Sequence, residues 1–312
     1  MINPVSNISY VPFVIPNKKS GRFYYSSPCD CVSFTSANLL KLSTEQISTK
    51  VLDAVADRAA NLIGGGREGI VYRIPGSEYC VKLIKRNPFT MKDFGEWHLT
   101  SDKKDAVNHI LARAENGATI MKYIEGTPLS CYTNLEEMAN LPKESYVKLL
   151  KQVSAAEDMK MFFDCAPANV LYDSGNKTLT AIDFYTPSVD FVMYPFTKVF
   201  SALESPHTSF QNIQNNKKLA GRLLDIALDG YEGAVEPEYK LIDDDIIRFL
   251  HKFKGAYSSM LPPQFDFLKK SFLELFDLKK AERRGDDVGN LIAGKIKYAR
   301  CIVKQILIGD KP

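Results

Sequence analysis

Two kinds of hydrophobic spacing divide the chain into a strand-rich part and a helix-rich part. After Ser43, apolar residues recur every three to four positions, which is the spacing of one helix face. Short β-branched and aromatic runs then occupy residues 70–74 and 79–84. Pro75-Gly76-Ser77 separates them, so this pattern predicts two antiparallel strands joined by a turn.

The next segment, from about Pro88 to Asn108, is polar and is predicted to be helical, and it precedes two further strands at 110–114 and 118–124. From Leu141 onward the spacing is mainly that of helices. Long helices are predicted at 216–229, 243–256, 264–280 and 287–308. The last is expected to dock on the core instead of entering a membrane. The predicted fold class is therefore α+β, with a small antiparallel sheet and one helix before a larger helical part.

Composition narrows the class of protein without identifying it. Hydrophobic residues make up 45% and charged residues 25%, as in ordinary globular proteins. A net charge of +3 gives no argument for a nucleic-acid partner. We find no apolar run of about 18 residues that predicts a membrane span, no Sec signal peptide and no CxxC pair. Residues 1–47 are rich in Ser, Asn, Thr and Pro, which predicts a flexible leader.

A glycine-rich segment lies just before the first strand pair. Gly64, Gly65, Gly66 and Gly69 are followed by Val71, in the pattern G-x-G-x-x-G-x-V. Such glycines let backbone N–H groups approach phosphate oxygens without a Cβ clash. A dinucleotide-binding unit requires a helix directly after the glycines, whereas a β-branched run follows here. A glycine-rich hairpin without a ligand remains the structural alternative.

Lys82 lies in the second strand between apolar neighbours, where its charge needs an anion. Phosphate oxygens under the glycine-rich turn would supply one, and a carboxylate on the following helix would hold the ammonium group. Glu96 is the candidate carboxylate, with Asp102 and Asp105 as alternatives.

The strongest polar cluster combines Asp164, Asn169 and Asp183. Asp164 and Asn169 lie five residues apart in a proline-containing loop after a predicted helix, and Asp183 follows the next apolar strand. This order brings two carboxylates and an amide to one place, and oxygen ligands of this kind suit Mg²⁺. The alternative is that each side chain only caps a local turn.

In this order, the motifs resemble those of protein kinases: a glycine-rich loop, a strand lysine, a D-x-x-P-x-N loop and an Asp-Phe pair. The resemblance implies a two-lobed domain, with residues 48–124 as the N-lobe and 125–312 as the C-lobe. It also implies ATP and Mg²⁺ as ligands, Asp164 and Lys82 with Glu96 as catalytic residues, and Asn169 and Asp183 as metal ligands. The strand expected to meet adenine carries Met121, Lys122, Tyr123 and Ile124.

Four positions depart from the family pattern. Phe162 and Phe163 replace the usual His-Arg pair before the catalytic Asp, Ala166 replaces a lysine, and Tyr185 replaces the glycine of Asp-Phe-Gly. Regulation by activation-loop phosphorylation is therefore not expected. Loss of the lysine removes a positive charge near the transferred phosphate and leaves open a pseudokinase that serves as a binding module.

Among kinases, Asn169-Val170-Leu171-Tyr172-Asp173 followed by Ile182-Asp183 is most similar to the OspG and NleH group of type III secretion effectors. That resemblance implies a serine/threonine kinase delivered into the host cytoplasm, with the leader as an uncleaved secretion signal. Host proteins are then the substrates, and ubiquitin or a ubiquitin-conjugating enzyme is a partner known for the group. Location in the bacterial cytoplasm is the alternative.

A second phosphotransferase class also fits part of the pattern. Small-molecule kinases of the aminoglycoside and choline type share the D-x-x-x-x-N and I-D-F motifs and often use a further Asp, here Asp190. They typically have a large acidic pocket in the helical part. The only dense acidic run here is 243–245, which is expected to begin a helix.

Overall fold

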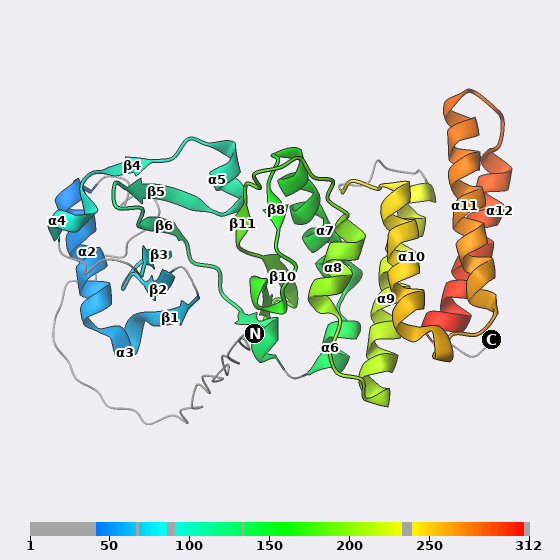
Figure 1. Ribbon diagram of the computed structural model, residues 1–312, viewed down its shortest axis with the longest axis horizontal. Helices are drawn as coiled ribbons and strands as arrows, with labels where there is room; N and C mark the ends of the chain where they lie inside the picture. Colours follow the sequence, from blue (N-terminus) through cyan, green and yellow to red (C-terminus); the bar gives the residue numbers. More distant parts are fainter. Residues whose placement is uncertain (1–41, 67–68, 86–90, 133, 233–238, 309–312) are drawn as a thin grey trace, which may run out of the picture.

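The computed structural model describes residues 42–66, 69–85, 91–132, 134–232 and 239–308. The molecule is elongated, with a sheet-rich part at one end and a helix-rich part at the other (Figure 1). Each part has its own hydrophobic core. Every strand pairing is antiparallel, so the predicted α+β class is confirmed.

The first part is built on one six-stranded sheet. Its elements are α2 (Thr44–Ala56), α3 (Arg58–Asn61), β1 (Leu62–Gly65), β2 (Gly69–Arg73), β3 (Tyr79–Ile84), α4 (Met91–Phe94), β4 (Trp97–Leu99), α5 (Lys103–Val107), β5 (Ile110–Ala114) and β6 (Thr119–Lys122). The strand order is β1-β2-β3-β6-β5-β4. The central strand β3 is therefore fixed on both sides, by β2 and β6.

Helix α2 begins where the sequence predicts it. The Ser43 hydroxyl accepts a hydrogen bond from the Gln46 N–H at 3.3 Å, and the Gln46 side chain accepts one from the Ser43 N–H at 2.9 Å. This reciprocal capping box defines the helix start. The apolar face then buries Val51 and Ala54 in the core of the sheet-rich part.

The predicted helix from Pro88 to Asn108 is wrong over the residues that the structure describes; Pro88 itself lies outside them. Two short helices, α4 and α5, flank strand β4, which pairs with β5. Gly95 breaks the helix because its φ is +61°, a left-handed conformation. Trp97 then buries its ring and donates a hydrogen bond to Ser48 of α2 at 3.1 Å. Tertiary packing thus overrides a weak local preference for helix.

The second part places small strands beside a helical core. Its elements are β7 (Thr127–Pro128), η1 (Leu129–Cys131), α6 (Leu135–Ala139), α7 (Lys143–Asp158), β8 (Phe162–Phe163), η2 (Pro167–Asn169), β9 (Val170–Asp173), β10 (Thr178–Ala181), β11 (Phe184–Tyr185), α8 (Pro195–Leu203), α9 (Phe210–Glu232), α10 (Asp243–Tyr257), η3 (Ser258–Met260), α11 (Gln264–Arg283), α12 (Gly289–Val303) and the π turn η4 (Lys304–Ile308). In Figure 1, the small strands lie between the six-stranded sheet and the helices α9 to α12.

The predicted long helices are present, and the last one docks on the core. Helix α12 buries Ile292, Ile296 and Ile302 and packs against α9 and α11. Among the described residues, no helix combines the length and apolar character needed to cross a membrane. Helix α8 was not predicted from the spacing. Its start is fixed instead by a side chain from another helix.

That side chain is Asp245, which lies in the first turn of α10 and is fully buried. Its carboxylate accepts hydrogen bonds from the N–H groups of Phe196 at 2.7 Å and Thr197 at 3.0 Å, and from the Thr197 hydroxyl at 2.7 Å. The acidic run 243–245 starts α10, as predicted, and also caps α8. Burial raises the pKa of Asp245 to about 6, although the hydrogen bonds from Phe196 and Thr197 act to lower it.

We expect this pKa to produce a measurable pH dependence of stability. The folded carboxyl binds its proton more tightly than the unfolded one, so its stabilising contribution is complete below about pH 4 and falls until about pH 6. Urea unfolding of the wild type and Asp245→Asn at both pH values measures the effect. The wild-type advantage is expected to shrink by on the order of 2 kcal/mol. A pH-independent difference would contradict it.

Candidate active site

Two predicted site residues meet at the end of a short strand pair. In the antiparallel β8–β11 pair, Phe163 lies opposite Phe184 and Phe162 lies opposite Tyr185. Asp164 follows β8 directly, and Asp183 precedes β11 directly. Asp164 and Asp183 therefore flank the same end of this strand pair, and both are exposed to solvent.

Asn169 connects the loop of Asp164 to the segment of Asp183. Its side-chain NH₂ donates to the Asp164 carbonyl at 3.2 Å, and its own carbonyl accepts from the Ile182 N–H at 2.8 Å. The amide nitrogen is thereby used inside the protein. The side-chain oxygen of Asn169 has no hydrogen-bond donor among the described residues and remains available as a ligand.

Lys82 reaches the same place from the six-stranded sheet. Its Nζ lies 3.9 Å from Oδ1 of Asp183, with the side chains 35% and 59% exposed. That separation exceeds a hydrogen bond, so the ammonium donors remain available to another oxygen. An exposed pair at this distance adds little stability. The contact is informative because it joins the two parts of the molecule at one charged point.

The predicted carboxylate partner of Lys82 does not lie on a helix. Glu96 lies exposed in the loop between α4 and β4, and the acid placed near Lys82 is Asp183. The two alternatives serve other purposes. Asp102 caps α5 by accepting from the Lys104 N–H at 2.8 Å. Asp105 is buried and paired with Arg113 at 2.6 Å.

The pairing of Asp105 also affects its protonation. Burial would raise its pKa, but hydrogen bonds from Arg113 and Thr100 and the Arg113 charge outweigh burial and lower it. Asp105 is therefore ionised and fixed to β5 at neutral pH.

The glycine-rich turn lies over β3. A Cβ on Gly69 would lie 2.6 Å from the Leu83 carbonyl oxygen and 3.3 Å from Cγ of Lys82, so only glycine fits there. At Gly64 and Gly66, in contrast, a Cβ would meet no atom within 4 Å. Neither backbone has a positive φ that requires glycine. Packing among the described residues therefore does not require glycine at these two positions.

Two further glycine-loop residues were also singled out. Gly65 closes β1, where its position pairs with Ile70, and Val71 pairs with Lys82 across β2 and β3. Val71 is thus the strand neighbour of the site lysine. Arg67 and Glu68 lie outside the described residues.

The predicted adenine strand forms the link between the two parts. Met121 and Lys122 end β6, and residues 123–126 lead to β7. The N–H of Lys122 donates to His109 at 2.9 Å and that of Tyr123 to Glu78 at 2.8 Å, so neither is free for adenine. Among the described residues, the N–H of Ile124 has no such partner.

Side chains reinforce this link. The Arg73 guanidinium lies 3.6 Å from the centroid of the Tyr123 ring and covers it. Burial, followed by the nearby Lys122 charge, lowers the pKa of His109, which keeps this imidazole neutral at physiological pH.

Asp183 has an unusual backbone conformation that its neighbours hold in place. Its φ is +64°, which is uncommon outside glycine and concentrates at functional sites. On one side, the Gln152 amide exchanges hydrogen bonds of 2.7 and 2.8 Å with Ala181. On the other, the Asn108 amide exchanges two of 3.0 Å with Phe184. We call these two side chains the amide clamps.

Sequence reasoning missed both amide clamps. Gln152 lies within a predicted helix, and Asn108 was taken as the end of another. The contacts span 29 and 76 residues, so no local spacing could reveal them. The only sign in the sequence was that each of these amide residues stands next to an apolar residue.

We expect Asn108→Ala to weaken the site more than the fold. The change leaves the buried Phe184 N–H and C=O without the amide, which is expected to reduce the free energy of unfolding by about 2 kcal/mol. Displacement of Asp183 is expected to slow catalysis by more than 10-fold. Urea unfolding measures the loss of stability, and initial rates measure the loss of activity. Asn176→Ala, an exposed turn amide, is the matched control, and equal rates for both variants would contradict a positioning role.

The residues that depart from the kinase pattern form an aromatic cluster. Phe163 is buried and lies 5.4 Å from Phe184, ring centroid to centroid. Phe162 lies 5.3 Å from both Tyr185 and Phe191. The connection from β11 to α8 consists of residues 186–194. In the segment between Asp164 and Asn169, the partly buried Ala166 and the exposed Ala168 carry no charge.

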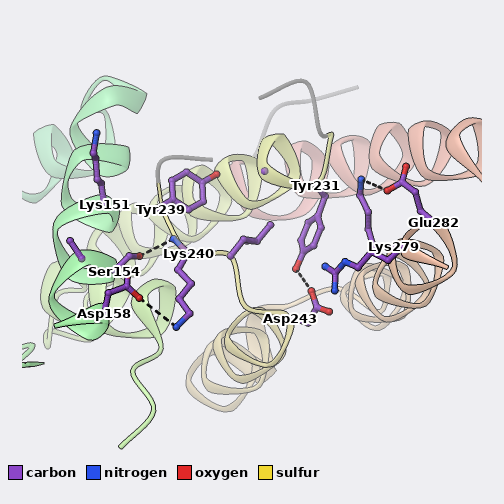
Figure 2. A pocket seen from close by; sticks show the side chains of 13 residues that line it. Lys151, Ser154, Asp158, Tyr231, Tyr239, Lys240, Asp243, Lys279 and Glu282 are labelled. Atoms are coloured by element: carbon purple, nitrogen blue, oxygen red, sulfur yellow. Dashed lines mark hydrogen bonds and ion pairs between the residues drawn. The ribbon is translucent and has the colours of Figure 1, made fainter. Parts of the chain in front are cut away.

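A separate cavity lies among the helices. It has a volume of about 620 Å³ and is bordered by α7, α9, α10 and α11 (Figure 2). Three carboxylates and four basic groups line it: Asp158, Asp243, Glu282, Lys151, Lys240, Lys279 and Arg283. Figure 2 shows Tyr231 donating to Asp243, at 2.8 Å, inside it. No predicted site residue lines this cavity.

The donor set suits a hard cation that is bound together with a phosphate ligand. The described residues contain no group of three or more His, Cys, Asp or Glu side chains arranged around a metal position. Mg²⁺ typically binds to one or two protein oxygens, with substrate phosphates and water completing its shell. The Asp183 carboxylate and the Asn169 side-chain oxygen fit that requirement.

Comparisons with known proteins add little to this description. No protein-family model and no curated protein matches the chain. One solved structure to which the chain is similar is the pseudokinase domain of BIR2, an immune regulator of the RLK/Pelle family. The identity is 13% and the TM-score 0.31, over 82% of this chain and 77% of that one. A likeness this distant assigns no role to any residue, and the function must be inferred from the site itself.

Proposed function

We propose that the protein is an ATP- and Mg²⁺-dependent phosphotransferase, and specifically a serine/threonine protein kinase. One observation supports this most strongly: Lys82 from the sheet approaches Asp183, which flanks the same end of the β8–β11 pair as Asp164. A cation and two exposed carboxylates from distant segments meet beside a glycine-rich turn. Phosphoryl transfer needs this combination, because catalysis of that reaction depends mainly on positioning and charge.

Each residue has a role in this proposal. Lys82 binds the α- and β-phosphates of ATP. Asn169 and Asp183 hold Mg²⁺, which neutralises phosphate charge when bound. Asp164 orients the acceptor hydroxyl and accepts its proton as the oxygen attacks phosphorus. Glu96 is not needed, because Asp183 provides the carboxylate next to Lys82.

The nucleotide is proposed to lie between two lobes, residues 48–124 and 125–312. The glycine turn covers its phosphates, and the adenine faces the link after β6. The Ile124 N–H is the donor of that link left free for adenine. The residues assigned to the nucleotide are Gly64, Gly65, Gly66, Gly69, Val71, Lys82, Met121, Lys122, Tyr123 and Ile124; the N–H groups of Lys122 and Tyr123 are used inside the protein and make no contact with adenine.

The biological setting is proposed from the sequence resemblance. As in the OspG and NleH group, the protein would act in the host cytoplasm on host proteins, with ubiquitin or a ubiquitin-conjugating enzyme as a partner. The proposed leader, residues 1–47, lies outside the described residues except for 42–47, of which 44–47 belong to α2. Translocation of a reporter fused to residues 1–43 into host cells would test the delivery.

The surroundings of Asp164 favour a protein acceptor over a small cationic one. The Phe162 ring, two residues before Asp164, packs against Tyr185 and is covered by the Lys198 ammonium. A cationic acceptor such as an aminoglycoside or choline is bound by carboxylates or by open aromatic faces. Here a lysine already covers the Phe162 ring, and its charge would repel such an acceptor. The helical cavity has mixed charge and is lined by none of these residues. Asp190 is exposed in the connection to α8.

Labelled ATP with Mg²⁺ and two acceptor sets distinguishes the acceptor classes. One set is a host-cell protein extract, and the other contains aminoglycosides and choline. Label on protein serine or threonine is the expected result. Label confined to the small molecules would establish the other phosphotransferase class. ATP binding without any transfer would identify a pseudokinase.

A further inference from the structure

A lysine outside the predicted motifs lies beside the proposed reaction centre. Lys198, on α8, has its Nζ 3.9 Å from the centroid of the Phe162 ring. The side chain is half-buried, and α8 also contacts η2, the turn that ends at Asn169. No carboxylate among the described residues lies within ion-pair distance of Lys198. A cation held against an aromatic face is thus left without a counter-ion.

The ring that Lys198 covers belongs to the segment that leads into Asp164. Phe162 and Asp164 are two residues apart, and alternate side chains of an extended segment point to the same face. They are separated by roughly 6.6 Å along the chain. We therefore expect the ammonium group over the Phe162 ring and the Asp164 side chain to lie on the same side of this segment.

The position of Lys198 is fixed by the buried cap on α8. Asp245 accepts three hydrogen bonds from Phe196 and Thr197, directly before Lys198. The helix therefore cannot slide or rotate freely against α10. A preorganised charge stabilises a transition state better than one that must be brought into place.

The charge of the site also calls for a second cation. Asp164 and Asp183 are two carboxylates; Lys82 lies next to Asp183, which also holds the proposed Mg²⁺, and Asp164 has no cation assigned to it. During transfer, negative charge spreads over the three outer oxygens of the γ-phosphoryl group. Lys82, on the α- and β-phosphates, leaves the acceptor side of that group uncompensated, and Ala166 in the loop carries no charge.

We propose that Lys198 is a catalytic residue that donates a hydrogen bond to the transferred γ-phosphoryl group of ATP. This inference rests on the proposed phosphotransfer function. In the step, the acceptor oxygen bonds to phosphorus while the bond from phosphorus to the β–γ bridging oxygen breaks. ADP leaves with that electron pair, and the acceptor proton passes to Asp164. Lys198 keeps its protons and stabilises the charge.

Lys198→Met tests the proposal because it removes the charge and keeps the apolar stem over Phe162. Hydrolysis of ATP with no added acceptor is one readout, so no substrate need be identified. We expect kcat to fall on the order of 100-fold. The affinity for ATP is expected to weaken, whereas that for ADP, which lacks the γ-phosphoryl group, stays unchanged. Lys198→Arg is expected to restore most of the rate.

Lys295→Met is the matched control. This lysine also lies over an aromatic ring, Tyr298 at 5.8 Å, but on α12 at the far end of the molecule. Equal rates for the two Met variants would overturn the proposal. So would equal weakening of ATP and ADP, or a higher acceptor KM with unchanged kcat. A wild type that neither hydrolyses nor transfers phosphate from ATP would instead refute the proposed function itself.

Discussion

Asp164→Asn is expected to lower kcat for phosphoryl transfer by about 1,000-fold while leaving ATP affinity within a few-fold of wild type. The amide keeps the shape of the carboxyl but cannot accept the acceptor proton, and general-base catalysis typically contributes 10²- to 10⁴-fold. Asp164 is exposed, and its carbonyl bond to Asn169 is made by the backbone, so the fold is expected to survive. Initial rates and ATP titrations measure the two quantities.

The control for this experiment is Asp190→Asn, which removes an exposed carboxylate in the connection to α8. Its kinetics are expected to match those of the wild type. If Asp164→Asn retains normal kcat, the assigned base is wrong. If Asp190→Asn is the variant that loses activity, the small-molecule phosphotransferase gains support.

Asp183→Asn is expected to abolish the dependence of ATP binding on Mg²⁺ and to reduce kcat at least 1,000-fold. The change removes a charged metal ligand and the carboxylate beside Lys82. Asparagine adopts positive φ as readily as aspartate, so the φ of +64° adds no new strain. The variant therefore tests charge with little change in backbone. ATP titrations with and without Mg²⁺ provide the measurement.

A thermal unfolding temperature close to that of the wild type would confirm that the Asp183→Asn variant is folded. Because the Lys82–Asp183 pair is exposed, its loss is expected to change stability by less than about 1 kcal/mol. Unchanged Mg²⁺-dependent affinity in a folded variant would remove Asp183 from the metal site.

The parts of the site closest in sequence were the most predictable. Asp164 and Asn169 lie in one short loop, and the strand between them and Asp183 has a clear apolar pattern. Their meeting follows from antiparallel pairing, which a short hairpin imposes. The prediction that Lys82 belongs to the site depended on the glycine-rich segment before it. Strand β3 lies where the β-branched and aromatic run predicted a strand.

The missed features depend on contacts between distant segments. Glu96 was assigned to a helix because the polar stretch from about Pro88 to Asn108 has no strong strand signal, yet Trp97 binds Ser48 of α2 and lies in strand β4. Asn108 and Gln152 bind the backbone on either side of Asp183, at Phe184 and Ala181, and these contacts form only in the folded chain. A side chain that binds a distant segment produces no periodic pattern in the segment to which it belongs.

The burial of Asp245 was hidden for the same reason. An acidic run at a helix start is normally exposed and favours the helix dipole. Here the third member turns inward to cap α8, which raises its pKa to about 6 through burial. Only the position of Pro195, a residue typical of a first helical turn, hinted that another helix begins nearby.

A crystal structure with Mg²⁺ and a non-hydrolysable ATP analogue would test the central claim most directly. We predict Lys82 Nζ within hydrogen-bond distance of the α- and β-phosphates, a metal on Asn169 and Asp183, and the γ-phosphoryl group between Asp164 and Lys198. Nucleotide bound elsewhere, for example in the helical cavity of Figure 2, with Lys82 and Asp183 free of phosphate and metal, would contradict it.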